Sequence, residues 1–496
     1  MMRELRRTTT GHRRGKVGVI AHEHGGDVRF MTRAEIEAFP ADPALRPGES
    51  AMDRARAAIA AAGCASAGQQ MGLRWPIGCV ALEVTQRCNL DCSLCYLSEN
   101  SEAVKDVPLE EIFRRIDLIY SHYGKHTDVQ VTGGDPTLRD HDELSAIVAR
   151  ISSLGMRPTL MTNGIRASRS LLTALAAHGL VDVAFHVDTT QQRKGFATEQ
   201  ALDRIRTEYL DRTRGLGLSV MFNTTVHDGN FHQIPELVRF LRAHAGAIRT
   251  ASFQLQAATG RGVQRERGTV ISPESVWRQI ELGAGTALNF EASRIGHPGC
   301  NRYALCLEAN GTLYDTFSDA GFVAELQAAT AGIALPRNDR LTVLRNLVVW
   351  LGLHPRFLYR IAKWLAARAW AMKSDLVRSG GRVTTLSFVV HNFMDAQALE
   401  EDRIRACVFK VMTGDGPISM CMHNTKRDSF ILRPVPLTKG PAVVFWHPMT
   451  GELTKQDPGR ASADPNTHPF RRTKGRTREH ALLKRRSGTA SARSDG

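Results

Sequence analysis

The sequence predicts an α/β protein in which helices alternate with the strands of a parallel sheet. Between residues 80 and 259, apolar runs rich in β-branched residues alternate with amphipathic stretches. Glycine follows or ends most of the amphipathic stretches, as helix ends require. Hydrophobic residues make up 42% of the 496-residue chain, which is enough for a large buried core. The alternation indicates consecutive βαβ units.

The first predicted strand, VALEV, begins at Val80 and precedes the helical segment LEEIFRRIDLIYSHY. Strands and helices then follow in the order DVQVTGG, HDELSAIVARISSLG, RPTLMTNG, RSLLTALAAHG, VDVAFHVD, a helix near 201–215, LSVMFNTTV, IPELVRFLRAHAG and ASFQLQAAT. Before them, residues 18–74 form a mixed leader with a helix near 52–62. The pattern therefore predicts six strand–helix units.

After Gly260 this rhythm ends, and residues 300–320 and 383–434 are predicted to form irregular hairpins. A turn at Gly414 is flanked by the alternating runs CVFKV and PISMC. Folding the chain there places Cys407 nearly opposite Cys421, and cross-strand neighbours lie about 5 Å apart. The second half of the chain thus differs in organisation from the first.

The net charge of +15 lies mostly at the two ends of the chain. Residues 1–17 carry six Lys or Arg and one acid, and residues 456–496 carry ten and four. Both ends are poor in large apolar residues, so we expect disordered basic tails. The simplest interpretation is a solvated appendage, and no specific nucleic-acid partner is expected. The start of the chain lacks the apolar core of a secretory signal, and no run of 18 apolar residues is present.

The nine cysteines indicate metal binding or catalysis, because a cytosolic chain keeps its thiols reduced. Cys88, Cys92 and Cys95 form a CxxxCxxC triplet on the loop after the first strand. Three thiolates on a tight loop can hold an iron–sulfur cluster while one iron stays open for a ligand. The alternatives are a zinc site and a closed electron-transfer cluster.

The segment CNLDCSLCY resembles the cysteine motif of the radical S-adenosylmethionine (SAM) superfamily, and the resemblance covers residues 78–259. It implies a partial (βα)6 barrel. It also implies that the turn Gly133, Gly134, Asp135, Pro136 binds the SAM amino group, with Asp135 in place of the usual Glu. Asp188 and Asn223, at later strand ends, are implied to contact ribose and methionine. His186, Gln254 and Gln256 also lie at strand ends, although His186 is better explained as a core residue.

The resemblance implies a 4Fe-4S cluster that binds SAM and cleaves it reductively to methionine and a 5′-deoxyadenosyl radical. That radical abstracts hydrogen from an unactivated carbon of the substrate. A small flavodoxin or ferredoxin is the implied electron donor. The protein itself supplies orientation and excludes water.

Four further cysteines follow the core, namely Cys300, Cys306, Cys407 and Cys421. Cys306 precedes an Asn-Gly turn, and the last two face each other across the second hairpin. Four converging thiolates would form a second 4Fe-4S cluster. The alternative is four independent buried thiols. The segments HPGCNRYAL, HNFMD and RACVFKVMTGDGPISMCMHN resemble the tetraether lipid synthase and dihydropterin methylase branch.

Together these observations predict a partial (βα)6 barrel of radical SAM type followed by an auxiliary-cluster domain of hairpins and helices. The expected parts are a basic tail over 1–17, a leader over 18–74, a core over 75–290, an auxiliary iron–sulfur domain over 291–455 and a second basic tail over 456–496.

The segment from Leu341 to Trp370 is apolar and basic, with three Trp. Phe357, Leu358, Ile361, Trp364 and Leu365 share one predicted helical stripe. Such a helix can lie in a membrane interface or cover a lipid channel, and it can equally be a cap packed on the barrel. We therefore expect a cytoplasmic protein, with a peripheral position at the inner membrane face as the alternative.

The leading hypothesis is a radical SAM enzyme that acts on an apolar substrate, such as a lipid, for C–C bond formation or methylation. A second hypothesis is modification of a ribosomally made peptide. A third is a non-catalytic iron–sulfur or zinc protein that binds nucleic acid through its basic tails.

Overall fold

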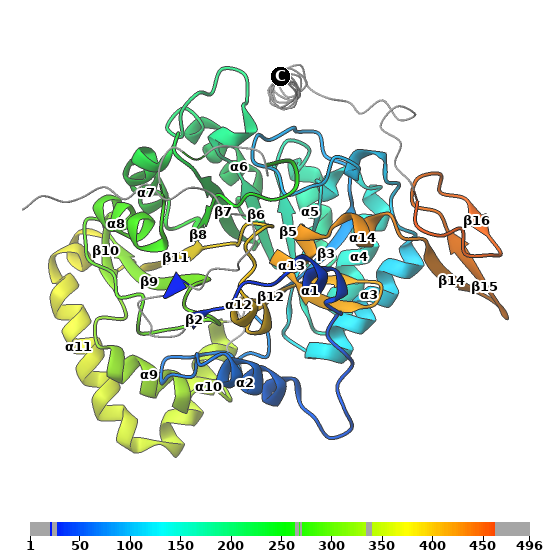
Figure 1. Cartoon of the computed structure of the whole chain (residues 1–496). Coiled ribbons are helices and arrows are strands. Elements are labelled where there is room, and N and C mark those ends of the chain that lie inside the picture. The colour runs from blue at the N-terminus through cyan, green and yellow to red at the C-terminus, as the bar shows by residue number, and fades with distance from the viewer. Residues whose placement is uncertain (1–19, 22–26, 263–266, 268–269, 334–339, 462–496) are drawn as a thin grey trace, which may run out of the picture.

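The computed structural model describes residues 20–21, 27–262, 267, 270–333 and 340–461, and its centre is a curved sheet wrapped by helices (Figure 1). The predicted basic tail over 1–17 lies outside these residues, as does the second tail from residue 462 onward.

Six parallel strands alternate with six helices and form the core of the molecule. The strands are β3 (Cys79–Thr85), β4 (Asp128–Gly133), β5 (Arg157–Thr162), β6 (Asp182–His186), β7 (Ser219–Val226) and β8 (Ile248–Leu255). The helices are α3 (Leu109–Tyr123), α4 (His141–Ser153), α5 (Arg169–Ala177), α6 (Asp203–Thr213), α7 (Ile234–Ala243) and α8 (Pro273–Ala284). The predicted (βα)6 arrangement is confirmed.

The alternation of side chains along each strand separates the core from a central cavity. In β3, Val80 and Leu82 are fully buried on the face covered by helices, while Ala81 and Glu83 point into the cavity. Helix α3 packs Ile112, Ile116 and Ile119 on that outer face, at helical spacing.

The second half of the chain extends the same sheet at both edges instead of forming a domain of its own. β11 (Thr384–His391) pairs in parallel with β8, and β12 (Phe409–Thr413) pairs in parallel with β3. β9 (Asn301–Ala309) and β10 (Thr312–Asp315) continue beyond β11, and β13 (Gly416–Ser419) continues beyond β12. The expected separate domain over 291–455 is therefore corrected: long-range pairing places its strands in the core's sheet.

The two edges of this sheet come close together at a seam. The rings of His391, at the end of β11, and Phe409, at the start of β12, lie 4.9 Å apart between centroids. Eight consecutive parallel strands thus form a nearly closed barrel, with the seam between β11 and β12.

Both predicted hairpins are present. β12 and β13 are antiparallel, with Thr413 opposite Gly416. Asn310 and Gly311 join β9 to β10 with φ of 51° and 77°, a left-handed conformation that suits Asn-Gly.

The remaining elements lie outside the barrel. They are β1 (Ile20–Ala21), β2 (Asp27–Val28), α1 (Arg33–Ala38), α2 (Ala51–Ala61), α9 (Ala320–Ala329), α10 (Arg340–Leu353), α11 (Pro355–Arg378), α12 (Glu401–Arg405), α13 (Met420–Thr425), α14 (Asp428–Ile431), β14 (Val435–Lys439), β15 (Ala442–Trp446) and β16 (Leu453–Thr454). Short 3-10 helices are η1 (Ser101–Ala103), η2 (Pro136–Leu138), η3 (Thr189–Gln191), η4 (Phe231–Gln233) and η5 (Gly260–Gly262). The helix expected near 52–62 is α2.

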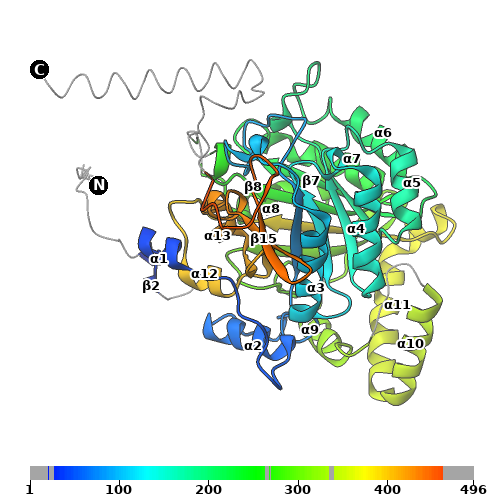
Figure 2. The same cartoon turned by 90° about the vertical axis from the view of Figure 1, so that its right-hand side faces the viewer.

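Helices α10 and α11 lie side by side and project from the body as a helical hairpin (Figure 2). The predicted apolar stripe is divided between two faces of α11. Phe357 is buried, whereas Leu358 and Leu365 are 57% and 54% exposed. Ile361 and Trp364 are half-buried on the side of Phe357. No helix among the described residues is long and apolar enough to cross a membrane.

Candidate active site in the barrel

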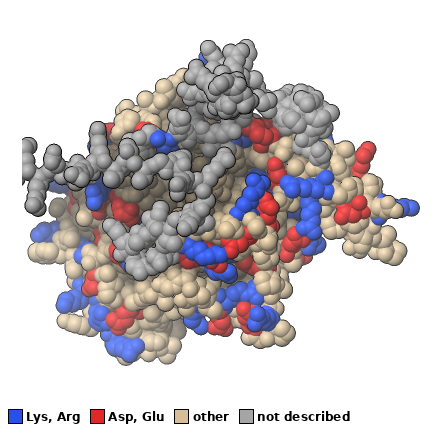
Figure 3. All heavy atoms as spheres, viewed as in Figure 1, with Lys and Arg blue, Asp and Glu red and all other residues tan. Residues whose placement is uncertain are grey.

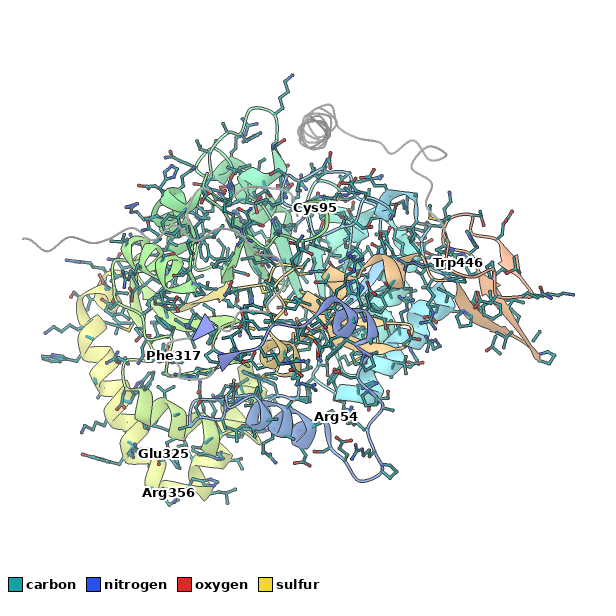
Figure 4. The ribbon with its side chains drawn as sticks, in the orientation of Figure 1. Arg54, Cys95, Phe317, Glu325, Arg356 and Trp446 are labelled. Carbon is teal, nitrogen blue, oxygen red and sulfur yellow. The ribbon has the colours of Figure 1, made fainter. Side chains whose placement is uncertain are left out.

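A cavity of about 1220 Å³ runs through the barrel. At the carboxyl ends of the strands it is lined by Cys88, Cys92, Cys95, Gly133, Gly134, Asn163, His186 and Asn223. At the amino ends it is lined by Asp128, Arg157, Asp182 and Arg249, and it reaches Thr342 in the first turn of α10. Cys95 lies in the upper part of the view in Figure 4, and Arg356, at the end of the helical hairpin, lies at its lower edge. The cavity therefore leads from the cysteine loop toward the base of that hairpin.

The three cysteines of the predicted motif all line this cavity, on the loop that follows β3. Backbone bonds hold the loop in place: Ser93 N–H donates to Thr190 O at 2.9 Å, and Arg261 N–H donates to Cys95 O at 2.9 Å. The Asn163 amide donates to Asn89 Oδ1 at 2.7 Å and lies 3.9 Å from Cys88 Sγ. Contacts from three other loops thus fix the motif at the mouth of the cavity.

Burial keeps the thiols of Cys88 and Cys92 protonated when no metal is bound. It raises the pKa of Cys88 to about 12 and raises the pKa of Cys92 well above its ordinary value. Metal binding must therefore displace protons, as it does at thiolate sites generally. Among the described residues, no three His, Cys, Asp or Glu side chains are placed to share one metal ion. Three thiols on one loop are nevertheless the donor type that iron–sulfur clusters take.

Gly133 and Gly134 form the part of the cavity wall where β4 meets the end of β3. A Cβ on Gly133 would lie 1.9 Å from Thr85 O, and one on Gly134 would lie 2.0 Å from Arg87 O. Tyr96 Oη donates to Gly133 O at 2.6 Å, which ties the cysteine loop to this turn. Only glycine fits here, and the backbone itself faces the cavity.

Asp135 and Pro136 are buried and do not line the cavity. Asp135 caps η2 by accepting from Thr137 N–H at 3.0 Å, and its other oxygen accepts from Asn163 N–H at 2.8 Å. Thr162 Oγ1 also donates to this carboxylate, at 2.9 Å. The expected contact of the Asp135 side chain with SAM is therefore corrected: local donors occupy its oxygens, and it positions the turn.

Asp188, like Asp135, caps a short helix and positions its neighbours. It is fully buried, caps η3 through Thr190 N–H at 2.9 Å and accepts from Thr225 N–H at 2.7 Å. Its Oδ2 lies 2.6 Å from His186 Nε2. Burial lowers the pKa of His186, but the Asp188 carboxylate outweighs this and raises it overall. The expected ribose contact of Asp188 is corrected, and His186, expected in the core, faces the cavity instead.

Asn223 faces the cavity, and it has a neighbour that the sequence did not single out. Ser252 of β8 lies directly beside Asn223 of β7 in the sheet register. Within the described residues, buried Asn223 Nδ2 and Ser252 Oγ have no hydrogen-bond partner. Because orphaned buried polar atoms are rare, this pair fits the polar groups of a bound ligand such as SAM. Gln254 also lines the cavity, whereas Gln256 does not.

A buried ion pair that the sequence analysis missed joins the C-terminal region to this site. Arg427 Nη1 lies 2.7 Å from Glu83 Oε1, and the guanidinium lies 4.8 Å from the centre of the Tyr96 ring. Burial raises the pKa of Glu83, but Arg427 outweighs this, so that it falls to about 2. The sequence feature that could have predicted this pair is Glu83, a charged residue inside the apolar run VALEV.

Three of the four C-terminal cysteines come together at the seam. Burial, together with the neighbouring thiols of Cys407 and Cys300, raises the pKa of Cys421 to about 12, so the three thiols lie close enough to interact. Met394 N–H donates to Cys421 Sγ at 3.4 Å, and Arg403 Nε donates to Cys300 Sγ at 3.3 Å.

Cys306 does not join them. Cys300 immediately precedes β9, and Cys306 is paired with Leu386 further along the same extended strand. Six residues of extended chain span about 20 Å, which is too far for two ligands of one cluster. Cys306 is instead fully buried in the main hydrophobic core. The predicted set of four thiolates is therefore corrected to three.

The barrel, the three-cysteine loop and the glycine turn define the class of this protein as a radical SAM fold. Residues 82–241 match the family described as the Radical SAM superfamily. The findings therefore support a radical SAM enzyme, and enzymes of this superfamily use a 4Fe-4S cluster and SAM.

Several characterised relatives share part of the chain. It is 25% identical over 186 residues to the 7,8-dihydro-6-hydroxymethylpterin dimethyltransferase of Methanocaldococcus jannaschii, covering 36% of each chain. It is 34% identical over 177 residues to the GTP 3′,8-cyclase of Streptomyces coelicolor, covering 34% of this chain and 50% of the cyclase. It is 28% identical over 165 residues to the PqqA peptide cyclase of Bradyrhizobium diazoefficiens, covering 32% and 42%. The chain thus spans half or less of each of these relatives.

Among solved structures, Streptococcus suis SuiB bound to S-adenosylmethionine matches with a TM-score of 0.33 at 16% identity, covering 41% of this chain and 45% of SuiB. The FeFe-hydrogenase maturase HydG from Carboxydothermus hydrogenoformans matches with a TM-score of 0.34 at 13% identity, covering 49% and 63%.

Proposed function

We propose that the chain is a radical SAM enzyme that abstracts hydrogen from an apolar, lipid-like substrate for C–C bond formation or methylation. The observation that carries this proposal is the arrangement at the carboxyl end of the barrel, where Cys88, Cys92 and Cys95 share one cavity with the backbone of Gly133 and Gly134. A bound cluster and SAM supply one-electron reductive cleavage, and a flavodoxin or ferredoxin supplies the electron.

The chain's own residues bind, orient and enclose the reactants. The three thiolates hold the cluster, and the backbone of Gly133 and Gly134 forms the adjoining wall. Asn223 and Ser252 offer unsatisfied polar atoms to SAM. Asp188 fixes the orientation of His186 toward the cavity. The barrel walls exclude water from the reacting atoms.

The shape and lining of the cavity support an amphiphilic substrate. Its middle section carries apolar side chains, among them Met161, Ala184, Met221, Leu305 and Val389, beside polar ones such as Gln130 and Thr159. Its far end carries the ion pair of Arg157 with Asp128, at 2.9 Å. A molecule with an apolar body and a polar end matches the lining of the cavity from its middle to its far end.

The helical hairpin supports a lipid source for that substrate. Its exposed large apolar residues are Leu341, Leu344, Val348, Val349, Leu353, Leu358, Tyr359, Leu365, Trp370 and Val377. Residues 340–378 contain eight Lys or Arg and one acid, Asp375. On the face in Figure 3, charges of both signs are interspersed, with basic side chains along the edge formed by α11. We propose that the hairpin docks on an anionic membrane surface, next to the base of the cavity.

A flotation assay with vesicles tests this docking. The chain should float with vesicles containing anionic phosphatidylglycerol, and a variant with Leu358, Tyr359, Leu365 and Trp370 changed to Ser should stay in the pellet fraction. A control with Val443 and Leu453 changed to Ser removes exposed apolar residues from β15 and β16 and should float normally. Equal flotation of both variants would contradict the assignment.

Isotope transfer tests the substrate class. With vesicles of chain-deuterated lipid as the only substrate, 5′-deoxyadenosine formed by the enzyme should contain deuterium. Product without deuterium, formed at the same rate with and without lipid, would remove lipids from consideration.

Modification of a ribosomally made peptide is the second candidate, because several relatives carry the name PqqA peptide cyclase. A short peptide gene beside this one, and a mass change in that peptide on incubation with the enzyme, would favour it. The third hypothesis, nucleic-acid binding, depends on the tails, and no observation on the described residues favours it.

A further inference from the structure

A cysteine outside both predicted groups lies beside the C-terminal thiols. Although burial lowers the pKa of His297, Asp402 and the nearby thiols of Cys300 and Cys64 raise it above its ordinary value overall. The same ring lies 3.0 Å from Asp402 Oδ2, which orients it. Cys64 comes from the leader, 236 positions before Cys300 in the sequence, yet both thiols influence the pKa of the same ring.

Hydrogen bonds of the Gln69 side chain and of the backbone hold the leader in place here. Gln69 Nε2 donates to Cys64 O at 3.2 Å and to Gly296 O at 3.0 Å, and Gly296 N–H donates back to Gln69 Oε1 at 3.0 Å. Arg294 N–H donates to Gly68 O at 2.9 Å. The Gln69 side chain is buried, so these bonds are shielded from water. The position of Cys64 relative to Cys300 is therefore built into the fold.

Cys64 also packs against the segment that carries Cys407. It belongs to one buried cluster with Ala406 and Val408, the two neighbours of Cys407. A Cβ added to Gly296 would lie 2.6 Å from Val408 Cγ1, so the two segments are in direct contact there. Three separate segments thus bring Cys64, Cys300 and Cys407 to one place, and Cys421 interacts with the last two.

Hydrogen-bond donors surround these sulfur atoms. Arg403 Nε donates to Cys300 Sγ, and Met394 N–H donates to Cys421 Sγ. Arg403 is buried, at 6% exposure. Positive charge and N–H donors around thiolates stabilise a negatively charged iron–sulfur cluster and tune its potential.

We propose that Cys64 is the fourth thiolate ligand of the second cluster, together with Cys300, Cys407 and Cys421, in the place that the sequence assigned to Cys306. The inference rests on the proposed function in one respect, because it requires an iron–sulfur enzyme in which a second cluster forms. A set of four thiolates closes the cluster to substrate, so it serves electron transfer or structure. The bound cluster would also link the leader, residues 18–74, to the seam of the barrel.

The test uses the full chain with Cys88, Cys92 and Cys95 changed to Ala, which leaves the second cluster alone. After anaerobic reconstitution, iron and sulfide should each be about four per chain, and the Mössbauer spectrum should show a 4Fe-4S cluster. Adding Cys64→Ser should lower the iron content at least twofold or yield a 3Fe-4S electron paramagnetic resonance signal. Adding Cys306→Ser, the matched control, should change neither the iron content nor the spectrum. Circular dichroism verifies that each variant is folded.

Unchanged iron content and spectrum with Cys64→Ser would overturn the assignment of Cys64 while leaving the second cluster in place. Loss of iron with His297→Ala but not with Cys64→Ser would identify the imidazole as the ligand and overturn it as well. Absence of iron from the parent variant, with four irons in the unmodified chain, would show that no second cluster forms. That result would remove this inference and leave the SAM-binding cluster untouched.

Discussion

The two groups of cysteines in this molecule are assembled in opposite ways. Cys88, Cys92 and Cys95 lie within eight residues on one loop, whereas Cys300, Cys407 and Cys421 are collected from three segments at the seam of the barrel. The first group depends on the local turn and on the glycines that receive it. The second depends on long-range strand pairing and on contacts between the C-terminal region and the core. The comparison predicts that different substitutions disable the two groups.

The largest effect is expected at the glycine turn beside the first group. Gly134→Ala places a methyl group 2.0 Å from Arg87 O, so β4 and the cysteine loop must separate. We expect a loss of about 4 kcal/mol in the free energy of unfolding and loss of SAM cleavage. Denaturant titration and 5′-deoxyadenosine yield measure both.

Gly352→Ala is the matched control, because this exposed glycine of α10 has no atom within 4 Å of an added Cβ. It should be neutral or stabilising by up to about 1 kcal/mol. If the two variants behave alike, the close approach at Gly134 has no structural importance.

The next effect concerns the contact between the C-terminal region and the core. Arg427→Met leaves the buried Glu83 carboxylate without its partner and should cost about 3–5 kcal/mol. Thermal and denaturant unfolding measure the loss. The double variant Glu83→Gln with Arg427→Met should recover much of it, because the unpaired charge is removed. A double variant as unstable as the single one would show that the pair itself, and not the stranded charge, carries the stability.

A smaller effect is expected within the SAM pocket. Asn223→Ala removes an amide whose Nδ2 has no partner among the described residues, so stability should change little. The KM for SAM should rise about tenfold, which corresponds to about 1.4 kcal/mol.

Asn230→Ala provides the contrast. The Asn230 amide donates to Glu199 Oε1 at 2.8 Å and to Thr225 O at 2.9 Å, so its loss should destabilise the fold and leave KM nearly unchanged. The reverse pattern for the two variants would exclude Asn223 from the SAM site.

The last effect is a pH dependence at the seam and within α13. Burial lowers the pKa of His391 and of His423 to about 4 each. Both folded values lie below the ordinary value of about 6.5, so the neutral rings contribute stability above pH 6.5. That stability is lost as the pH falls toward 4. The denaturant midpoint should therefore decrease between pH 7 and 5, at constant iron content. The variant with both residues changed to Gln should show a flatter profile, and an identical slope would contradict the assignment.

Local features of the sequence were sufficient to predict the six strand–helix units, the cysteine loop and the turn at Gly414. They were insufficient for the pairing of Val411 with Ala81 or of Ser387 with Thr250, because periodicity does not specify partners far apart in the chain. For the same reason, neither the seam nor the approach of Cys64 to Cys300 followed from spacing.

Asp135 and Asp188 were assigned to SAM through the resemblance to the radical SAM superfamily, yet each is followed two positions later by a threonine and caps a short helix. Capping by a short carboxylate competes with ligand binding, and this local signal was present in the sequence. The residues that do face the cavity, His186 and Asn223, are distinguished by strand alternation alone.

The central claim is that Cys88, Cys92 and Cys95 support reductive cleavage of SAM, and the most direct measurement is 5′-deoxyadenosine formed by the anaerobically reconstituted chain with reductant and SAM. The unmodified chain and Cys306→Ala should both form it, and Cys92→Ala should form none above the enzyme-free control. Equal yields from Cys92→Ala and the unmodified chain would contradict the account.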